Sequence, residues 1–317
     1  MTAFVTLLDA VLAAEQPITT GKMTALRDNP IAIAQGDPTA PSINPAAIEI
    51  GGKGTDGTMV NGTTLSGPGY FDFDGITVST PKTIPLCSII RVKGNVTLSS
   101  VLTVALRSLT STTNDDEARN LAAVMDAVIP ADGTGTTTGT GGSNAGQGGP
   151  SSTGPLPIGR SSFYRPWGML RPIMGGNGGV RSGGSGGNDW GPGGGCLILI
   201  VEGDCDFTGG SIKANGGITN DLGAGSNQPG GGAGGSIIVV CTGQITNGTF
   251  EAKGGTARSD GSSGGNGDGG GGAIYLIATD FTGTQTMTVT GATYGNAGVS
   301  AAITLTRDQI RTLLGRM

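Results

Sequence analysis

Hydrophobic positions cluster three times between residues 196 and 278, and each cluster directly follows a run of glycines. The clusters are residues 196–201, 236–241 and 273–278, in which hydrophobic side chains occupy nearly every consecutive position. A short, continuously apolar run is typical of a strand that is buried on both faces, as in a parallel sheet. We therefore expect three buried strands of a parallel sheet.

A second stretch follows each cluster, and here hydrophobic and polar positions alternate, which predicts a strand with one buried and one solvated face. The clusters begin 40 residues apart (196 to 236) and then 37 residues apart (236 to 273), a spacing typical of stacked repeats. The predicted fold is mainly β: a short parallel β-solenoid with glycine-rich segments between its coils. The alternating pairs are Ile212 and Ala214, Phe250 and Ala252, and Met287 and Val289.

Both ends of the chain carry helical patterns. Residues 1–45 predict a small helical module with a proline-rich connector, in which one helix starts with Thr20 as its cap and ends before Pro30. Near the other end, Thr306 and Gln309 form a capping-box pattern ahead of an apolar stripe. We interpret the C-terminal helix as a cap on the end of the solenoid.

Residues 46–130 predict a β-rich domain with a closing helix. Strand-like runs with turn residues between them occur from residue 70 to 98, and they are either an earlier, degenerate part of the same solenoid or its cap. The helix starts at Asn114 and ends at Pro130, which suits an element that covers a sheet edge. Two further domains follow: a Gly-rich segment at 131–195 and the Gly-rich β-repeat domain at 196–317.

Glycine dominates the composition, with 63 of 317 residues, and 12 of the 21 residues from 175 to 195 are glycine. Two interpretations stay open for these segments. They are flexible linkers, because Gly/Ser chains gain little from ordering. Alternatively they are packed polyproline-II-like rows of the polyglycine-II type, because only glycine lets such backbones approach closely.

Charge and cysteine usage limit the partners. The net charge of −5 and the lack of a basic run argue against nucleic acid, and no apolar stretch is long enough to insert into a membrane. The stretch 1–16 lacks the basic start of a secretory signal. The four cysteines have no metal-ligand spacing, so we expect buried free thiols in a protein made in a reducing cytosol.

The chain contains no histidine, which excludes Ser-His-Asp and Cys-His catalysis and histidine-ligated zinc. The sequence therefore predicts a non-enzymatic protein with no catalytic residues, no metal site and no cofactor. The alternative is a glycosidase-like pair of carboxylates brought together by folding. Its candidates, which we interpret as solvated turn residues, are Glu202, Asp204, Asp206 and Glu251.

The densest group of aromatic and arginine side chains lies just before the glycine-rich repeats. Such side chains on loops are typical of contacts with a saccharide or a protein. The competing interpretation, which we prefer for Trp167, is that they fill an internal or subunit interface. The candidate receptor contacts are Phe163, Tyr164, Arg165, Trp167, Arg171, Arg181 and Trp190.

The repeated unit of a glycine cluster, an apolar strand, an alternating strand and a second glycine pair resembles glycine-rich bacteriophage tail-fibre and tail-tip adhesin proteins. The resemblance covers roughly residues 131–295, and residues 23–37 also look like the opening of phage tail or fibre proteins. It implies packed polyglycine-II helices whose loops touch the host surface. The long apolar strands of this chain depart from a pure polyglycine sandwich.

These observations predict a phage virion protein of the tail or a fibre that is assembled in the host cytoplasm and attaches to the host cell. Its N-terminus would contact other virion proteins, its distal part a host saccharide or outer-membrane protein. We expect a homo-oligomer, with a trimer favoured. The main alternative is a purely structural virion subunit: a minor capsid, head-fibre or fibre-scaffold protein. A polysaccharide depolymerase and a bacterial surface protein are further alternatives.

Overall fold

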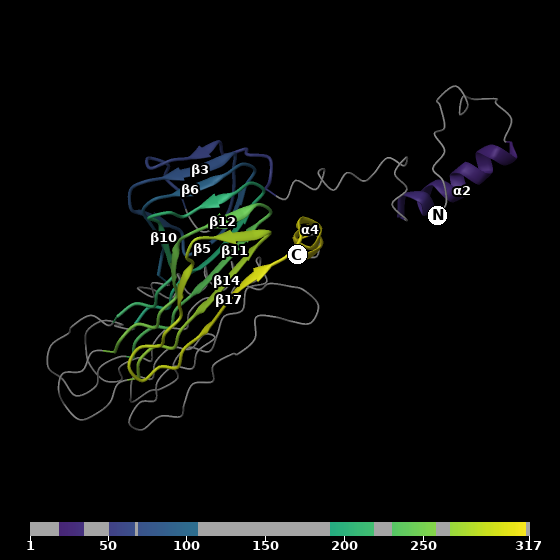
Figure 1. Ribbon diagram of the computed structural model, residues 1–317. Helices are drawn as coiled ribbons and strands as arrows, with labels where there is room; N and C mark the ends of the chain where they lie inside the picture. Colours follow the sequence, from purple (N-terminus) through teal and green to yellow (C-terminus); the bar gives the residue numbers. More distant parts are fainter. Residues whose placement is uncertain are drawn as a thin grey trace. The chain divides into compact units, whose positions relative to one another are not determined.

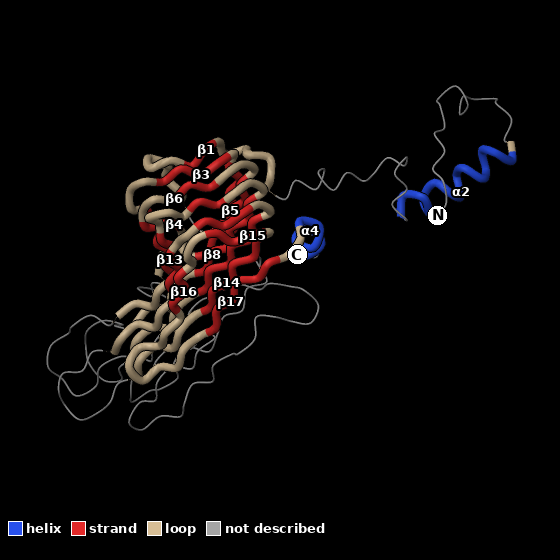
Figure 2. Tube along the Cα trace, in the orientation of Figure 1, coloured by secondary structure: helices blue, strands red, loops and turns tan. Residues whose placement is uncertain are grey.

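The computed structural model describes residues 19–34, 51–66, 69–106, 191–218, 230–257 and 267–314 of the 317-residue chain. The chain divides into two compact units, Met1–Glu49 and Ile50–Met317. In the first unit the structure describes one helix, α2 (Thr20–Ala34). All the strands described belong to the second unit, which is mainly β (Figures 1 and 2).

The strands form three parallel sheets. The first sheet contains β1 (Thr58–Met59), β3 (Gly75–Val78), β6 (Val96–Leu98), β9 (Cys205–Asp206), β12 (Gln244–Thr246) and β15 (Asp280–Thr282). The second contains β4 (Lys82–Ile84), β7 (Val101–Val104), β10 (Ser211–Lys213), β13 (Thr249–Glu251) and β16 (Thr286–Thr288). The third contains β2 (Gly69–Phe73), β5 (Cys87–Val92), β8 (Cys196–Val201), β11 (Ser236–Cys241), β14 (Ala273–Ala278) and β17 (Val299–Thr304).

The chain visits the sheets in a fixed order: third, first, second, and then third again one strand further along. Five complete turns follow this path, from β2–β3–β4 to β14–β15–β16, and each strand pairs with its equivalent in every neighbouring turn. This arrangement is consistent with the expected parallel β-solenoid. Because β5 pairs with β8 in parallel, the strands before residue 106 belong to the same stack as the later repeats.

The predicted buried strands are confirmed: all six residues of β8, of β11 and of β14 are buried. The alternating strands are also present, with Ile212 and Phe250 fully buried in the middle of β10 and β13. The sequence pattern missed β9, β12 and β15, which complete each turn. These strands have only two or three residues, and a run that short carries too few positions to show a period.

The interior enclosed by the three sheets holds the main hydrophobic core. Each sheet contributes side chains that stack on their equivalents one turn away, such as Phe73 on the third sheet and Val78 on the first. Phe207 and Phe250 meet edge to face inside, with ring centroids 5.4 Å apart. Burying such aromatic side chains removes the largest apolar areas from water, so they contribute most to the stability of the stack.

Helix α4 (Arg307–Leu314) begins with the predicted capping box. The N–H of Gln309 donates to Thr306 Oγ1 at 3.3 Å, and the N–H of Thr306 donates to Gln309 Oε1 at 2.8 Å. The predicted position of this helix is wrong, however. Ile310 packs in a second cluster with Ile198 and Val240 of the third sheet, so α4 covers the outer face of that sheet instead of the end of the stack.

Helix α2 also differs from its prediction at both ends. Its cap is Thr19, whose carbonyl accepts a hydrogen bond from the N–H of Met23 at 3.1 Å and whose hydroxyl accepts from Lys22 N at 3.3 Å. The helix continues through Pro30 to Ala34. A proline removes one backbone donor and disfavours helical geometry before it, but it does not forbid a helix.

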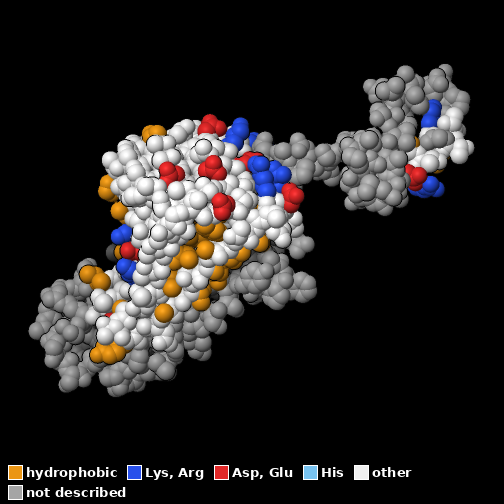
Figure 3. Space-filling model, in the orientation of Figure 1, with side chains coloured by type: hydrophobic (Ala, Val, Ile, Leu, Met, Phe, Trp, Pro, Cys, Tyr) orange, Lys and Arg blue, Asp and Glu red, His pale blue; other side chains and the backbone are white. Residues whose placement is uncertain are grey.

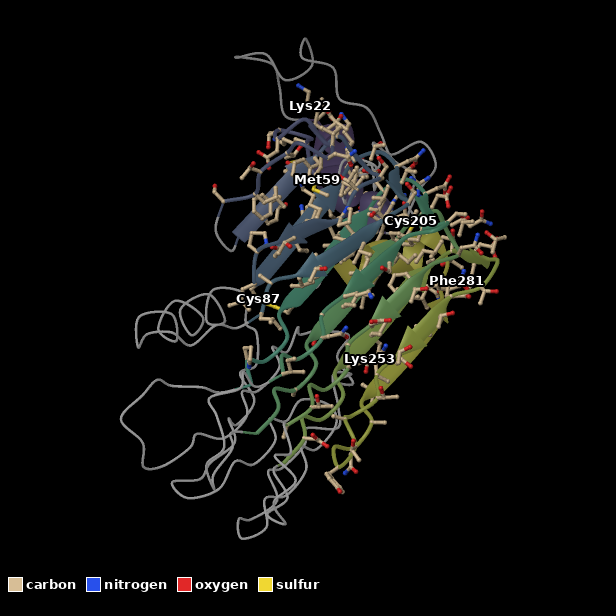
Figure 4. All side chains as sticks on the ribbon, turned by 90° about the vertical axis from the view of Figure 1, so that its left-hand side faces the viewer. Lys22, Met59, Cys87, Cys205, Lys253 and Phe281 are labelled. Carbon is tan, nitrogen blue, oxygen red and sulfur yellow. A yellow bond between two sulfur atoms is a disulfide. The ribbon has the colours of Figure 1, made fainter. Side chains whose placement is uncertain are left out.

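The two ends of the stack are built differently. At the N-terminal end, residues 51–66 cover the first turn: Met59 enters the core, and Figure 3 shows charged side chains on the surface at this end. Asp72 holds the cover in place by accepting hydrogen bonds from the N–H groups of Lys53 and Gly54, both at 2.9 Å. Lys82 Nζ, from strand β4, donates hydrogen bonds to carbonyl groups of this cover, including Asn61 O at 3.3 Å. At the C-terminal end, Phe281 is only partly buried against the core, because no described strand follows β15 in the first sheet (Figure 4).

The expectation of four free thiols is wrong for two of them. Cys87 and Cys196 form a disulfide with Cα atoms 4.8 Å apart, although 109 residues separate them in sequence (Figure 4). They are register partners on the adjacent strands β5 and β8, a neighbourhood that spacing in the sequence does not reveal. Cys205 and Cys241 are free and buried, and burial together with the Cys241 thiol raises the pKa of Cys205.

Candidate functional site

One corner of the stack carries the long insertions of the second unit. The first turn crosses from the second to the third sheet in two residues, between Ile84 and Cys87. The same crossing contains residues 107–190 in the next turn, then 219–229, then 258–266, all outside the described residues. Since equivalent corners of successive turns stack on one another, these insertions leave the stack from neighbouring positions along one edge.

The chain on either side of these insertions forms what we call the glycine layer. Its outgoing segments, which leave the second sheet, are residues 214–217, 252–255 and 289–292. Its returning segments, which enter the third sheet, are residues 191–195, 230–235, 267–272 and 295–298. Figure 2 shows these segments as loops that extend together beyond the ends of the strands.

Backbone hydrogen bonds join equivalent segments in successive turns. Among the returning segments, the N–H of Gly194 donates to Ala233 O at 2.8 Å, and the N–H of Gly234 donates to Gly270 O at 2.9 Å. The outgoing segments follow the same pattern, with Gly254 N–H donating to Thr290 O at 2.9 Å. Each segment is therefore bonded along the direction of the stack, as the strands are.

A second set of hydrogen bonds joins the outgoing to the returning segments. The N–H of Gly217 donates to Pro192 O at 2.7 Å, and Gly232 N–H donates to Gly217 O at 3.1 Å. In the next turn, Gly255 N–H donates to Gly232 O at 2.8 Å and Gly269 N–H to Gly255 O at 2.9 Å. The glycine layer is thus bonded in two directions, whereas a β-sheet is bonded in one.

Glycine is required in this layer because the backbones touch. A Cβ atom at Gly254 would fall on the carbonyl of Gly269, and one at Gly232 would fall on the carbonyl of Pro192, both well inside 3 Å. The contacted atoms are backbone atoms that are held by their own hydrogen bonds. A side chain here would therefore have to displace a neighbouring segment.

A buried carboxylate holds together the outer margin of the layer, which we define as Leu106, Ile218, Ala257, Asp268 and Tyr294. Asp268 is only 4% exposed, and its two oxygens accept hydrogen bonds from Ala257 N at 2.7 Å and from Tyr294 N at 2.9 Å. These partners lie on the last outgoing segment before an insertion and on the turn between two segments. One side chain therefore joins three pieces of backbone where the layer meets its insertions.

Apolar side chains are exposed at the same margin. Leu106 is 41% exposed, Ile218 is 64% exposed and Tyr294 is 67% exposed. Leu106 and Ile218 are the last described residues before the first two insertions. Large exposed apolar side chains close to the points where loops emerge are typical of a binding surface.

The seven candidate contact residues from the sequence all belong to the insertion 107–190. Phe163, Tyr164, Arg165, Trp167, Arg171, Arg181 and Trp190 lie outside the described residues, so their role stays a prediction. The structure describes the two ends of that insertion, Leu106 and Gly191. The sequence did not predict a role for Leu106, Ile218 and Tyr294, because these residues are far apart along the chain and form no motif.

The four carboxylates considered as a catalytic pair take structural roles: Glu202, Asp204 and Asp206 lie in or just before β9, and Glu251 lies on β13. Asp204 Oδ1 accepts from Gln244 N at 2.8 Å, and Asp206 Oδ1 accepts from Thr208 N at 2.9 Å. Glu202 Oε1 lies 3.9 Å from Arg307 Nη2, and Glu251 forms an ion pair with Lys213 on the second sheet. Within the described ranges, no three acidic or cysteine side chains gather as a metal site would require.

No family model, no curated protein and no solved structure matches the chain. Among the described helices, none combines the length and the apolar character that a membrane crossing requires. The geometry of the glycine layer and its margin is therefore the basis for assigning a function.

Proposed function

We propose that this protein is a non-enzymatic phage virion protein of the tail or a fibre, and that it attaches to the host cell through the insertions at the margin of the glycine layer. The single observation that carries the proposal is that the described residues on either side of 107–190, 219–229 and 258–266 lie at one corner of successive turns. Binding loops that share one edge of a firm scaffold are a common design for recognition.

The glycine layer supplies the scaffold in this proposal. We interpret its two-directional hydrogen bonding as packing of the polyglycine-II type, in which rows of backbone lie closer than any side chain allows. Such a layer extends the stack outward without needing a hydrophobic core of its own. The insertions then start from fixed points, which lowers the entropy lost when they bind a ligand.

In this proposal the aromatic and arginine residues of the first insertion contact the host surface, together with the exposed side chains of the margin. Arginine and aromatic side chains dominate binding energy in most interfaces and also stack on sugar rings. A host saccharide and an outer-membrane protein are both suitable partners. The first unit, Met1–Glu49, would join the protein to the virion, and the assembled form would be a homo-oligomer, with a trimer favoured.

The test is binding of fluorescently labelled full-length protein to candidate host cells. The double substitution Arg181→Ala with Trp190→Ala is expected to lower cell binding at least tenfold, whereas Tyr70→Ala, an exposed aromatic on β2, leaves it unchanged. Unchanged binding by the double variant would remove both residues from the site. If the folded wild-type protein does not bind host cells at all, the attachment function is rejected.

The open C-terminal end of the stack favours a second candidate, a purely structural virion subunit. The strands β15, β16 and β17 have no described neighbour on one side, and such edges are suited to assembly. Limited proteolysis of intact particles separates the candidates. Cleavage within residues 131–190 shows exposed loops, as attachment requires, and complete protection shows that they are buried between subunits.

A further inference from the structure

A groove lies on the stack away from the glycine layer, at the corner where the chain passes from the first sheet to the second. Its volume is about 370 Å³, within the range of small-ligand sites. Three successive turns line it: β10 and the residues before it, then β13, then β16. The described part of the chain places no long insertion at this corner, so the groove is built from the regular stack.

Hydroxyl groups form a regular column along this groove. Ser211, Thr249 and Thr286 are register partners on β10, β13 and β16, so about 4.8 Å separates one from the next. They face outward because the next residue on each strand, such as Phe250, points into the core. Within the described ranges, none of these three hydroxyl groups makes a hydrogen bond to another residue, which leaves each free to donate or accept.

The floor of the groove is backbone and one ring. Gly209 and Gly248 have φ values of 75° and 118°, a conformation that favours glycine, so no side chain fills the corner at these positions. Phe207 lines the groove from beneath. Since Phe207 is only 1% exposed, the floor offers little apolar surface, and polar groups provide most of the possible contacts.

A lysine supplies the charge at one side. The side chain of Lys213 is 36% exposed, and its Nζ lies 3.5 Å from Glu251 Oε2. Glu251 also pairs with Lys253 at 3.1 Å and accepts from Asn215 Nδ2 at 3.1 Å (Lys253 is labelled in Figure 4). Burial raises the pKa of Glu251, but these polar partners lower it further, so the net direction is downward and Glu251 stays ionised.

Two ammonium groups share one carboxylate here, so the side of the groove keeps a positive charge. Lys213 is the ammonium group that also lines the groove, and its contact with Glu251 is long for an ion pair. It can therefore bind a second carboxylate without giving up a tight partner.

We infer that this groove binds an acidic saccharide, with the sugar chain lying along the column of hydroxyls and a sugar carboxylate at Lys213. A regular series of free hydroxyls suits a ligand that repeats hydroxyls itself, and the groove is open, so a chain can pass through it. Lys213 is the one cation among the described residues that line the groove, which suits a carboxylated sugar better than a highly charged polyanion. This site is separate from the loop margin and does not depend on the attachment proposed for it.

Titration calorimetry of the full-length protein with a galacturonic-acid oligosaccharide tests the inference. Lys213→Met, which keeps the aliphatic stem, is expected to weaken binding ten- to a hundredfold. Thr249→Val, which removes only the hydroxyl, is expected to weaken it three- to tenfold. The matched control is Thr77→Val on β3 of the first sheet, which is exposed and remote from the groove and leaves the affinity unchanged.

Two further ligands define the chemistry. A galactose oligosaccharide without carboxylates is expected to bind at least tenfold more weakly, and poly-glutamate is expected not to bind. Equal binding of the neutral sugar would reject the role of Lys213, and equal binding of poly-glutamate would reject the saccharide. Absence of binding by wild type, or an equal loss in Thr77→Val, would overturn the site. None of these outcomes bears on the loop margin, which is tested by cell binding.

Discussion

The interior of the three sheets and the glycine layer are continuous pieces of the same turns, yet they pack by different means. Inside the sheets, side chains such as Phe250 and Ile212 fill the space between backbones. In the glycine layer most positions are glycine, and the backbones close the space themselves through hydrogen bonds in two directions. One stacked repeat therefore produces a hydrophobic core between the three sheets and, beyond it, a layer held mainly by backbone hydrogen bonds.

This difference changes what each region tolerates. A hydrophobic core accepts other apolar side chains of similar volume at modest cost. The tightest positions of the glycine layer accept none, because the atoms that a Cβ would meet there belong to neighbouring backbone, as at Gly254 and Gly232. The sequence of the layer is therefore restricted to glycine at many positions by packing of the backbone alone.

The largest effect is expected in the core. Phe250→Ala removes a fully buried ring that meets Phe207, and it should lower the free energy of unfolding by about 3–5 kcal/mol. Urea denaturation followed by circular dichroism measures the change. Met287→Leu, a swap of similar volume on β16, serves as the control and should cost less than about 1.5 kcal/mol. A small effect at Phe250 would mean that the interior is not the main source of stability.

The disulfide links the two turns between which the longest insertion lies. Replacing Cys87 and Cys196 together by alanine should lower the free energy of unfolding by about 2–4 kcal/mol, since the bond closes a loop with a sequence separation of 109. The measurement is denaturation with and without a reductant. Reductant should weaken the wild type and leave the double variant unaffected, and equal behaviour of the two proteins would contradict the bond.

The glycine layer should respond to the smallest possible side chain. Gly254→Ala places a methyl group against the backbone of Gly269 and should cost about 1–3 kcal/mol. Gly62→Ala is the matched control, because nothing lies within 4 Å of a Cβ there, and it should stay within about 0.5 kcal/mol of the wild type. Equal stability of the two variants would show that the layer is looser than its hydrogen bonds indicate.

The carboxylate at the margin of the layer allows a more local test. Asp268→Asn replaces one accepting oxygen by a donor that faces either Ala257 N or Tyr294 N, and it should cost roughly 1–2 kcal/mol. Amide hydrogen exchange should accelerate at those two residues and leave the strands of the third sheet unchanged. Faster exchange throughout the sheets would mean that margin and core unfold as one unit.

The smallest expected effect is that of acid. Backbone hydrogen bonds from Gly54 and Lys53 lower the pKa of Asp72 despite partial burial, and the pKa of Glu251 is lowered as well. A carboxylate whose pKa is lowered by folding stabilises the protein at pH values above its unfolded pKa of about 4. This stabilisation is lost as the pH falls through the folded-state pKa. Unfolding midpoints should decline below about pH 4, with a shallower slope in Glu251→Gln.

The sequence by itself determined the buried strands β8, β11 and β14, since at least five consecutive apolar residues in each require burial on both faces. It also determined the capping box of α4, because Thr306 and Gln309 are three residues apart and interact locally. The regular spacing of the apolar clusters along the chain predicted that the repeats stack on one another. In each case the signal lies within a few residues or repeats along the chain.

Tertiary structure alone decided the features that join distant residues. The third strand of each turn, the Cys87–Cys196 bond and the position of α4 on the third sheet all depend on which segments become neighbours after stacking. The same holds for the groove, whose hydroxyls at Ser211, Thr249 and Thr286 are about 37 residues apart in sequence but one strand apart in space. Composition shows that glycine is abundant, but only the contact between backbones explains why positions such as Gly232 and Gly254 need glycine.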